Sequence, residues 1–264
     1  MDIISGIILG VVQGLTEFLP ISSSGHLILA REVLGLKTSY GLSFDAVLQL
    51  ATSLAVLVYF RADFMRLFKV ATAWLQRRAI EQKDKILLLA LIIGTIPAVI
   101  LGLLLEDYMG TTFRSSELVA FALIAGAVLF FLAEKFAKKN ENLTVKKGLW
   151  IGLFQTLALI PGMSRSGMTI SGGLFFGLSR EDAARFSFML AFPIIFGGGM
   201  KKLLELSGSG ALSEIGLSLL VGALSAFIVG MFAIHYLLKY LKNHTLGIFI
   251  VYRLALAVLV LALL

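Results

Sequence analysis

The sequence predicts an all-α polytopic membrane protein with one integral membrane domain covering residues 1–264, and three observations predict this class. The 264 residues are 58% hydrophobic and 15% charged, and the mean hydropathy of +0.95 is outside the range of a soluble globular domain. The apolar runs are long and the polar stretches between them are short. Lys and Arg gather in a few of these connections, so the net charge of +7 indicates membrane topology and no nucleic-acid partner.

Six apolar runs predict six transmembrane helices, because a helix of about 20 apolar residues crosses the hydrocarbon core. Three of the runs reach that length, and the other three need a few flanking residues. In chain order the six runs are 44–60, 86–105, 118–133, 186–204, 215–238 and 245–264.

Two further regions, 3–30 and 148–179, are apolar runs interrupted near the middle by proline, glycine and a cluster of serines. Proline and glycine end helices, and non-helical backbone inside a bilayer has to be buried in protein or line a cavity. We therefore expect each region to form a re-entrant pair of helices that enters and leaves on one face of the membrane.

The charged connections predict the orientation, because Lys and Arg stay on the cytoplasmic side. Residues 61–85 contain seven Lys or Arg and residues 135–147 contain five lysines, so both connections face the cytoplasm. The connections 106–117 and 205–214 are acidic in balance and face outward. It follows that the first re-entrant pair opens to the outside and the second opens to the cytoplasm.

An internal repeat agrees with this topology. Gly10 and Gly25 are 15 residues apart, as are Gly152 and Gly167, and in both stretches a glutamine, a proline and a serine cluster lie between the glycines. One re-entrant pair and three spans per repeat would invert the second repeat relative to the first. The alternative is a chance match of two short glycine-rich runs. The two repeats cover about residues 1–136 and 148–264.

The first broken region carries candidates for an acid, a base and a nucleophile. Gln13 and Glu17 are four residues apart and share one helix face, and Pro20 and Gly25 frame the turn that follows. A carboxylate, an imidazole and three hydroxyls are costly in hydrocarbon unless they line an aqueous cavity. The alternative is a polar helix end near the lipid headgroups. The candidate site residues are Gln13, Glu17, Ser22, Ser23, Ser24 and His26.

The second broken region carries groups that bind an anion. Arg165 is the only charged residue from 148 to 179 and lies among hydroxyls. A guanidinium binds phosphoryl oxygens through two N–H groups, and glycines beside a helix N-terminus expose backbone N–H donors. The alternative, a simple helix N-cap, leaves the arginine unexplained. With Arg165 as a catalytic candidate, the substrate-binding candidates are Ser164, Ser166, Gly167 and Thr169.

These motifs resemble the two signature regions of the undecaprenyl pyrophosphate phosphatase (bacitracin resistance) family. The first reads Gln-x-x-x-Glu followed by Ser-x-Ser-Gly-His, and the second reads Pro-Gly-x-Ser-Arg-Ser-Gly-x-Thr. The resemblance extends to chain length, span order and the repeat. It implies hydrolysis of undecaprenyl diphosphate to the monophosphate and inorganic phosphate, which recycles the lipid carrier of cell-wall synthesis. It also implies a bacterial cytoplasmic membrane protein with a site open to the outer side.

The resemblance also places functional roles on particular positions. Many members of the family carry Glu where this chain has Gln13, and a neutral amide cannot act as a base, so the proton-handling role moves to Glu17 or His26. The family is considered metal-assisted, which makes Glu17 the expected ligand of a divalent cation, Mg²⁺ or Ca²⁺. The family's functional positions fall on Gln13, Glu17, Ser23, His26, Ser164, Arg165 and Thr169.

We expect a phosphoryl transfer in which Arg165 and nearby backbone amides hold the diphosphate. The chain has no cysteine, which excludes a thiol nucleophile. Ser23 is the first choice, with His26 or Glu17 accepting its proton. His26 as the nucleophile, and a water activated by Glu17, are alternatives that the sequence leaves open.

A second class of function is a polyprenyl-phosphate flippase or another secondary transporter, because inverted repeats with broken helices recur in transporters. Against it, transport does not require serine, histidine and arginine side chains arranged for chemistry. The expected partners are the polyprenyl diphosphate substrate and membrane lipids, and a homodimer is left open.

Arg253 in the last span is a further candidate, either functional or in a structural ion pair with Asp45.

Overall fold

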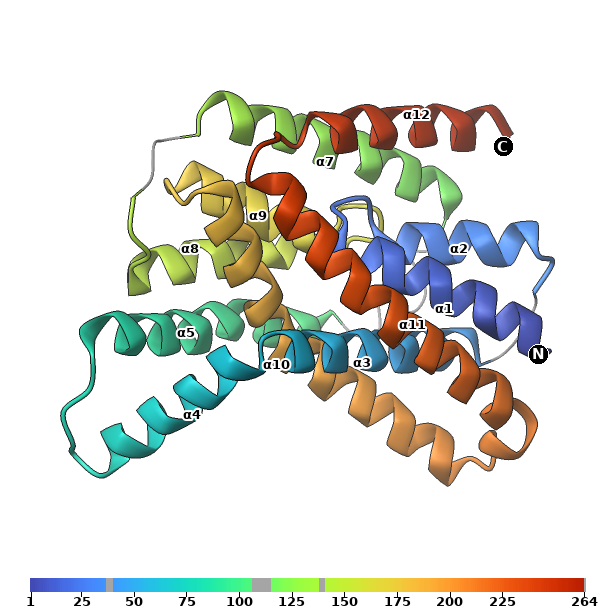
Figure 1. Cartoon of the computed structure of the whole chain (residues 1–264). Helices are drawn as coiled ribbons and strands as arrows, with labels where there is room; N and C mark the ends of the chain where they lie inside the picture. Colours follow the sequence, from blue (N-terminus) through green and yellow to red (C-terminus); the bar gives the residue numbers. More distant parts are fainter. Residues whose placement is uncertain (37–39, 106–114, 138–140, 264) are drawn as a thin grey trace.

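The computed structural model of the chain describes residues 1–36, 40–105, 115–137 and 141–263. Every regular element within these ranges is a helix, which confirms the all-α class. Figure 1 shows them gathered in one bundle, with both ends of the chain on the right-hand side. Part of a predicted outward connection, 106–114, and Lys138 and Lys139 of a predicted cytoplasmic one lie outside the described residues.

Five of the described helices are long and apolar enough to cross a membrane. They are α3 Gly41–Tyr59, α5 Gln82–Leu104, α7 Ser116–Lys135, α10 Arg180–Gly208 and α11 Leu212–Leu241. Each overlaps one predicted span, which supports a multi-pass membrane protein. The remaining predicted span corresponds to α12, an apolar helix of 17 residues over Gly247–Leu263, at the short end of what crosses a bilayer.

Both broken regions consist of two short helices joined by an irregular turn. The helices are α1 Ile3–Phe18 and α2 Ser23–Val33 in the first region, and α8 Val145–Thr156 and α9 Arg165–Phe175 in the second, with a 3₁₀ turn at Leu157–Leu159. Each turn ends on a serine that caps the next helix with a positive φ, 75° at Ser22 and 71° at Ser164. In Figure 1 the α1–α2 pair opens to the right and the α8–α9 pair opens to the left.

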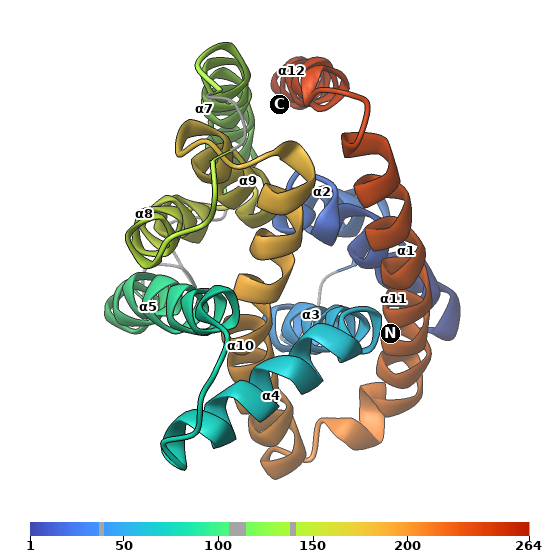
Figure 2. The same ribbon diagram turned by 60° about the vertical axis from the view of Figure 1, so that its left-hand side comes forward.

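Glycines let the first helix of each broken pair pack closely on a long helix. Helix α1 lies along α11, and α8 lies along α5 (Figures 1 and 2). A Cβ atom on Gly222 of α11 would lie 2.7 Å from the carbonyl oxygen of Gly6, and one on Gly94 of α5 would lie 2.7 Å from that of Gly148. Only glycine fits at such distances, which is typical of tightly packed membrane helices. Gly6 and Gly148 are equivalent in the predicted repeats, so the two halves pack alike here.

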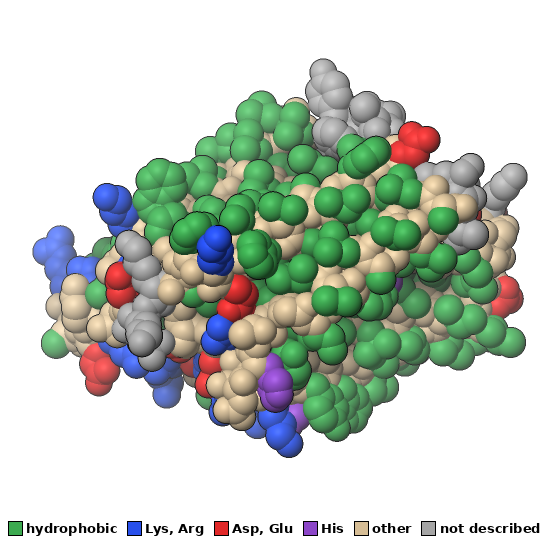
Figure 3. Space-filling model, turned by 90° about the horizontal axis from the view of Figure 1, so that it is seen from above, with side chains coloured by type: hydrophobic (Ala, Val, Ile, Leu, Met, Phe, Trp, Pro, Cys, Tyr) green, Lys and Arg blue, Asp and Glu red, His purple; other side chains and the backbone are tan. Residues whose placement is uncertain are grey.

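Aromatic side chains lie among the aliphatic residues of the interior where the two halves meet. Helix α3 packs against α10, and α7 packs against α12. Phe18 of α1 meets Phe188 of α10 edge to face, with ring centroids 5.2 Å apart, and Phe130 of α7 is fully buried. On the outside, Figure 3 shows hydrophobic side chains over the middle of one face, with Lys and Arg gathered at one end. This distribution is expected for a protein surrounded by lipid.

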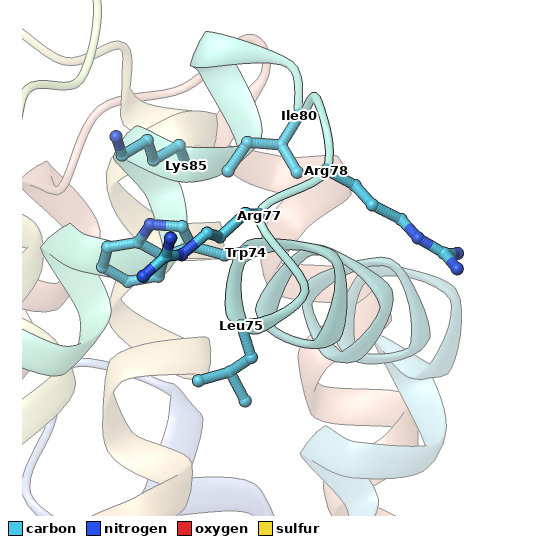
Figure 4. Close-up of a pocket in the computed structure, with 6 residues that line it drawn as sticks. All are labelled: Trp74, Leu75, Arg77, Arg78, Ile80 and Lys85. Atoms are coloured by element: carbon cyan, nitrogen blue, oxygen red, sulfur yellow. The ribbon is translucent and has the colours of Figure 1, made fainter.

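Helix α4, Arg61–Leu75, was not predicted, because it lies in a stretch interpreted as a charged connection. It is amphipathic and buries Leu67 and Val70. The turn after it contains Arg77 with a φ of 56°. A shallow hollow of about 590 Å³ opens there (Figure 4), lined by Trp74, Leu75, Arg77, Arg78, Ile80 and Lys85. None of these six residues is a predicted site residue.

Candidate active site

The turns of the two broken regions meet inside the bundle. The backbone N–H of Gly162 donates a hydrogen bond to Ser22 Oγ at 3.2 Å, and Ser166 Oγ donates to the carbonyl oxygen of Leu19 at 3.3 Å. Helices α2 and α9 therefore begin beside each other. The first N–H groups of a helix have no acceptor within it, and two helix N-termini in one place favour a bound anion.

Glu17 is the centre of a buried hydrogen-bond network. Its Oε1 accepts a hydrogen bond from Nη2 of Arg165 at 2.5 Å. Its Oε2 accepts one from Ser23 Oγ at 2.5 Å and one from Gln13 Nε2 at 2.8 Å. The Glu17 side chain is 5% exposed and that of Arg165 is 15% exposed, so the buried carboxylate has the charged partner that it requires. Three residues of the first region are thus joined to the arginine of the second.

Two polar atoms of this network are buried without a partner, namely Gln13 Oε1 and Arg165 Nη1. An unpaired buried polar atom costs about 1–3 kcal/mol, and more when the group is charged. Such exceptions are rare in folded proteins, and the others among the described residues lie outside this network, on Arg31, Gln155 and Ser171. A ligand that offers an anionic oxygen to Arg165, together with a donor or a cation for Gln13, supplies both missing partners.

His26 lies beside this network but makes no hydrogen bond with Ser23 in the described structure. Its Nδ1 donates to the carbonyl oxygen of Ser22 at 2.7 Å, so in the neutral ring Nε2 accepts from the Tyr252 hydroxyl, also at 2.7 Å. The two rings stack with centroids 5.7 Å apart. Of the two bases considered for the Ser23 proton, Glu17 is the one in hydrogen-bond contact with the Ser23 hydroxyl.

The other predicted serines stabilise the two turns. Ser22 Oγ accepts from the Gly25 N–H at 3.4 Å and lies 3.3 Å from Ser24 Oγ. Ser164 Oγ lies 3.3 Å from Ser166 Oγ and accepts from the backbone N–H three residues later at 3.2 Å. The two turns therefore have matching hydrogen bonds, with the hydroxyls close to the point where the turns meet.

Gly167 and Thr169 hold α9 against its neighbours. A Cβ atom on Gly167 would lie 2.5 Å from a ring carbon of Phe130, so only glycine fits there. The Thr169 hydroxyl donates to the carbonyl oxygen of Arg165 at 2.8 Å and lies 2.5 Å from Ser187 Oγ of α10. Neither residue forms a hydrogen bond with Glu17 in the described structure, and both act on Arg165 through the placement of α9.

The structure corrects one expectation and adds one residue. Asp45 forms an ion pair with Arg31 of α2, and among the described residues Arg253 donates only to backbone carbonyls. Of the two roles left open for Arg253, the ion pair with Asp45 is therefore wrong. Tyr252, the partner of His26, was missed. It lies 226 positions from His26 in the chain, and its only sequence signal is its neighbour Arg253, a charged residue in an apolar run.

The described residues offer few ligands for a metal ion, since no group of three or more His, Cys, Asp or Glu side chains occurs among them. Glu17 and the unpartnered Oε1 of Gln13 are oxygen ligands of the kind that Mg²⁺ and Ca²⁺ prefer. Mg²⁺ is often held by one or two carboxylates together with substrate phosphates and water. These two residues therefore fit a cation that arrives with a phosphorylated ligand.

Comparisons with known proteins agree over the whole chain. The family model described as bacitracin resistance protein BacA matches residues 6–259. The chain is 43% identical to the undecaprenyl-diphosphatase of Rubrobacter xylanophilus, covering 100% of this chain and 99% of the relative. It is 45% identical to undecaprenyl-diphosphatase 1 of Corynebacterium jeikeium, covering 100% and 95%. It is 43% identical to the undecaprenyl-diphosphatase of Chloroherpeton thalassium, covering 100% and 97%.

Proposed function

The chain belongs to the bacitracin resistance protein BacA family, and we propose that it hydrolyses undecaprenyl diphosphate to undecaprenyl phosphate and inorganic phosphate. Relatives named undecaprenyl-diphosphatase match it from end to end. The contact between Arg165 and Glu17 carries the proposal, because it joins an anion-binding guanidinium, a carboxylate and the Ser23 hydroxyl at one buried point. Phosphoryl transfer requires groups of these kinds.

In the proposed reaction, Arg165 and the N-termini of α2 and α9 hold the diphosphate, and Nη1 of Arg165 finds its missing acceptor there. Ser23 Oγ attacks the terminal phosphorus and gives its proton to Glu17. The new bond joins Ser23 Oγ to phosphorus, the bond from phosphorus to the bridging oxygen breaks, and undecaprenyl phosphate leaves with the electron pair. Water then attacks the phosphoserine, Glu17 returns the proton to Ser23 Oγ, and dihydrogen phosphate leaves.

The geometry supports Ser23 over His26 as the nucleophile. The Ser23 hydroxyl already donates to a carboxylate, as an activated nucleophile does. Both nitrogens of His26 are engaged, one by the Ser22 carbonyl and one by Tyr252. We assign His26 the task of holding the first turn, through its bond to the Ser22 carbonyl.

We also propose that a divalent cation, Mg²⁺ or Ca²⁺, accompanies the diphosphate and that Glu17 and Gln13 Oε1 hold it. When bound, the cation neutralises charge on the phosphoryl oxygens. The support is the chemistry of the two oxygen donors and the buried, unpartnered state of Gln13 Oε1.

The proposed topology has six spans, including α12, and two re-entrant pairs, α1–α2 and α8–α9, in an inverted repeat in the bacterial cytoplasmic membrane. It is supported by the matching capping serines, by the matching glycine contacts and by the opposite openings of the pairs in Figure 1. The end that holds α4 and its basic turn faces the cytoplasm under the positive-inside rule. The α1–α2 pair, with Glu17 and Ser23, then opens to the outer side.

A polyprenyl-phosphate flippase on the same framework is the second candidate. The observation that favours it is the direct contact between the turns of the two halves, since broken helices of inverted repeats meet in this way in transporters. The active-site network distinguishes the two candidates, because a flippase has no need of a serine that donates to a buried carboxylate.

Phosphate release from undecaprenyl diphosphate by the purified protein in detergent tests the proposal. We expect release by the parent and a loss of about 10²-fold or more for Ser23→Ala and for Arg165→Ala. Arg180→Lys is the control, because Arg180 pairs with Glu134 outside the network, and its rate should match the parent. A folded parent that releases no phosphate would contradict the proposal, and lipid transport without hydrolysis would favour the flippase.

A further inference from the structure

Arg253 of α12 is fully buried, at 0% exposure, and no carboxylate of the described residues pairs with it. Its hydrogen bonds within the described part of the chain all go to backbone carbonyls of other segments. The acceptors are the oxygens of Leu123 at 3.1 Å from Nε, Ala122 and Gly162 at 3.1 and 2.8 Å from Nη2, and Pro20 at 3.4 Å from Nη1. A buried cation among apolar helices is costly, so this arrangement requires an explanation.

Two of the four acceptors belong to the two broken turns, Pro20 in the first and Gly162 in the second. Neither carbonyl lies in a helix, and an unpaired carbonyl is unfavourable inside a bilayer because no water is there to pair with it. One guanidinium satisfies both. Gly162 is held from its other side as well, because its N–H donates to Ser22 Oγ. Arg253 therefore links the turns through a second route, in addition to this direct bond.

Helix α7 is shaped to receive this guanidinium. A Cβ atom on Gly126 would lie 2.8 Å from Cζ of Arg253, so only glycine leaves room for the cation. One helical turn later, the ring of Phe130 lies with its centroid 4.8 Å from Cζ, within cation–π range. The same ring packs on Gly167 at the start of α9. The guanidinium is thus confined by α7 as well as by its four acceptors.

We propose that Arg253 is a positioning residue that holds the two broken turns in register, so that Arg165 meets Glu17. Arg165 lies three residues after Gly162, and Glu17 lies three residues before Pro20. A shift of either turn therefore separates the guanidinium of Arg165 from the carboxylate. This inference rests on the proposed function, and it assigns the last helix to the active site.

The simpler role, anchoring α12 to α7 through Ala122 and Leu123, would affect stability and leave catalysis alone. A glycine substitution separates the two roles. Gly126→Ala displaces the guanidinium without removing its charge, and alanine is the better helix former. Its Cβ would also lie 3.1 Å from the carbonyl oxygen of Met163 in the second turn, so the result must agree with that of a variant that leaves α7 unchanged. Gly197→Ala is the matched control, because apart from the backbone of its own helix nothing in the described structure lies within 4 Å of its Cβ position. Arg253→Lys is the second variant, since an ammonium keeps the charge but lacks the planar fork that reaches four acceptors.

The experiment measures kcat and KM for phosphate release together with amide hydrogen exchange of the segments 18–24 and 160–167. We expect Gly126→Ala and Arg253→Lys to lower kcat by about 10²-fold, the effect of a displacement of roughly 1 Å near reacting groups, with KM changed less than about threefold. Both segments should exchange faster. Gly197→Ala should match the parent in every measurement.

The inference would be overturned if folded Gly126→Ala and Arg253→Lys both kept the kcat of the parent. It would also be overturned if both segments kept the amide exchange rates of the parent in these variants, even if the melting temperatures fall. A folded parent without phosphatase activity overturns the proposed function instead. In that case the exchange measurement still decides whether Arg253 holds the turns together.

Discussion

Replacing Glu17 by glutamine removes the charge at the centre of the network and keeps the shape of the side chain. Glu17 accepts three hydrogen bonds, from Arg165, Ser23 and Gln13. The glutamine carbonyl can still accept from Arg165, but its NH₂ group then faces two donors. Gln13 can remove one conflict by turning its unpartnered Oε1 to the new amide, and the Ser23 hydroxyl can rotate. The variant is therefore expected to fold.

The expected loss in the free energy of unfolding follows from these hydrogen bonds. One hydrogen bond to a charged acceptor is lost, which is worth about 1.5–3 kcal/mol. The neutral glutamine also leaves the Arg165 charge without its counter-charge, so the total loss approaches the roughly 3–5 kcal/mol expected when a buried ion pair is broken. Catalysis is affected as well. Without a base for the Ser23 proton, we expect kcat to fall by about 10²–10⁴-fold.

The assay is phosphate release by the purified variant, with thermal unfolding measured on the same sample. Glu134→Gln is the matched control, because Glu134 also accepts hydrogen bonds from an arginine, Arg180, and from a backbone N–H, but lies outside the site. It should lose comparable stability and keep its kcat. A Glu17→Gln protein that is folded and retains kcat within about tenfold of the parent would refute the assignment of Glu17 as the base.

Three further predictions concern packing, His26 and the cation. Gly222→Ala should lower the free energy of unfolding by about 1–3 kcal/mol, because the added methyl group overpacks α11 on α1, and the thermal midpoint should fall. Gly216→Ala is the control, since the nearest neighbour of its Cβ position is 4.0 Å away, and its midpoint should equal that of the parent. Equal midpoints for the two variants would contradict the close packing of α11 on α1. Tyr252→Phe removes the hydrogen bond to His26 and keeps the aromatic ring, so kcat should stay within about tenfold of the parent. A loss of kcat as large as that of Glu17→Gln would show that His26 acts in the chemistry. A chelator should lower the rate of phosphate release, and added Mg²⁺ should restore it. In Gln13→Glu a lower Mg²⁺ concentration should be enough, because a second carboxylate binds the cation more tightly. An unchanged rate in excess chelator would exclude the cation.

The motifs predicted which side chains form the candidate site, and the structure brings them together, because these side chains lie close together within two short segments. Glu17 and Ser23 belong to one short segment and Arg165 to a second, and the charge pattern of the connections indicated that the two segments enter from opposite faces. The direct bond of Arg165 to Glu17 is compatible with that prediction. The motifs gave no indication that Glu17, and not His26, receives the hydrogen bond of Ser23, since that depends on side-chain directions within one turn.

Other features depend on contacts between distant helices and have little local signal. Tyr252 reaches His26 because α12 packs beside α7 and the first turn, which no local pattern near Tyr252 shows. Thr169 bonds with Ser187 of α10 because of how α9 lies on that helix. Helix α4 was missed for a different reason. Its charged residues dominate the hydropathy of 61–75, while only two of its apolar side chains, Leu67 and Val70, are buried.

In the proposed mechanism, Ser23 attacks the substrate while Glu17 takes its proton. The most direct measurement is to mix the enzyme with undecaprenyl diphosphate radiolabelled in its terminal phosphate, quench within one turnover and identify the labelled residue. We expect acid-stable phosphoserine at Ser23, absent in Ser23→Ala and strongly reduced in Glu17→Gln. Acid-labile phosphohistidine at His26, or turnover by the parent with no labelled protein at any quench time, would contradict it.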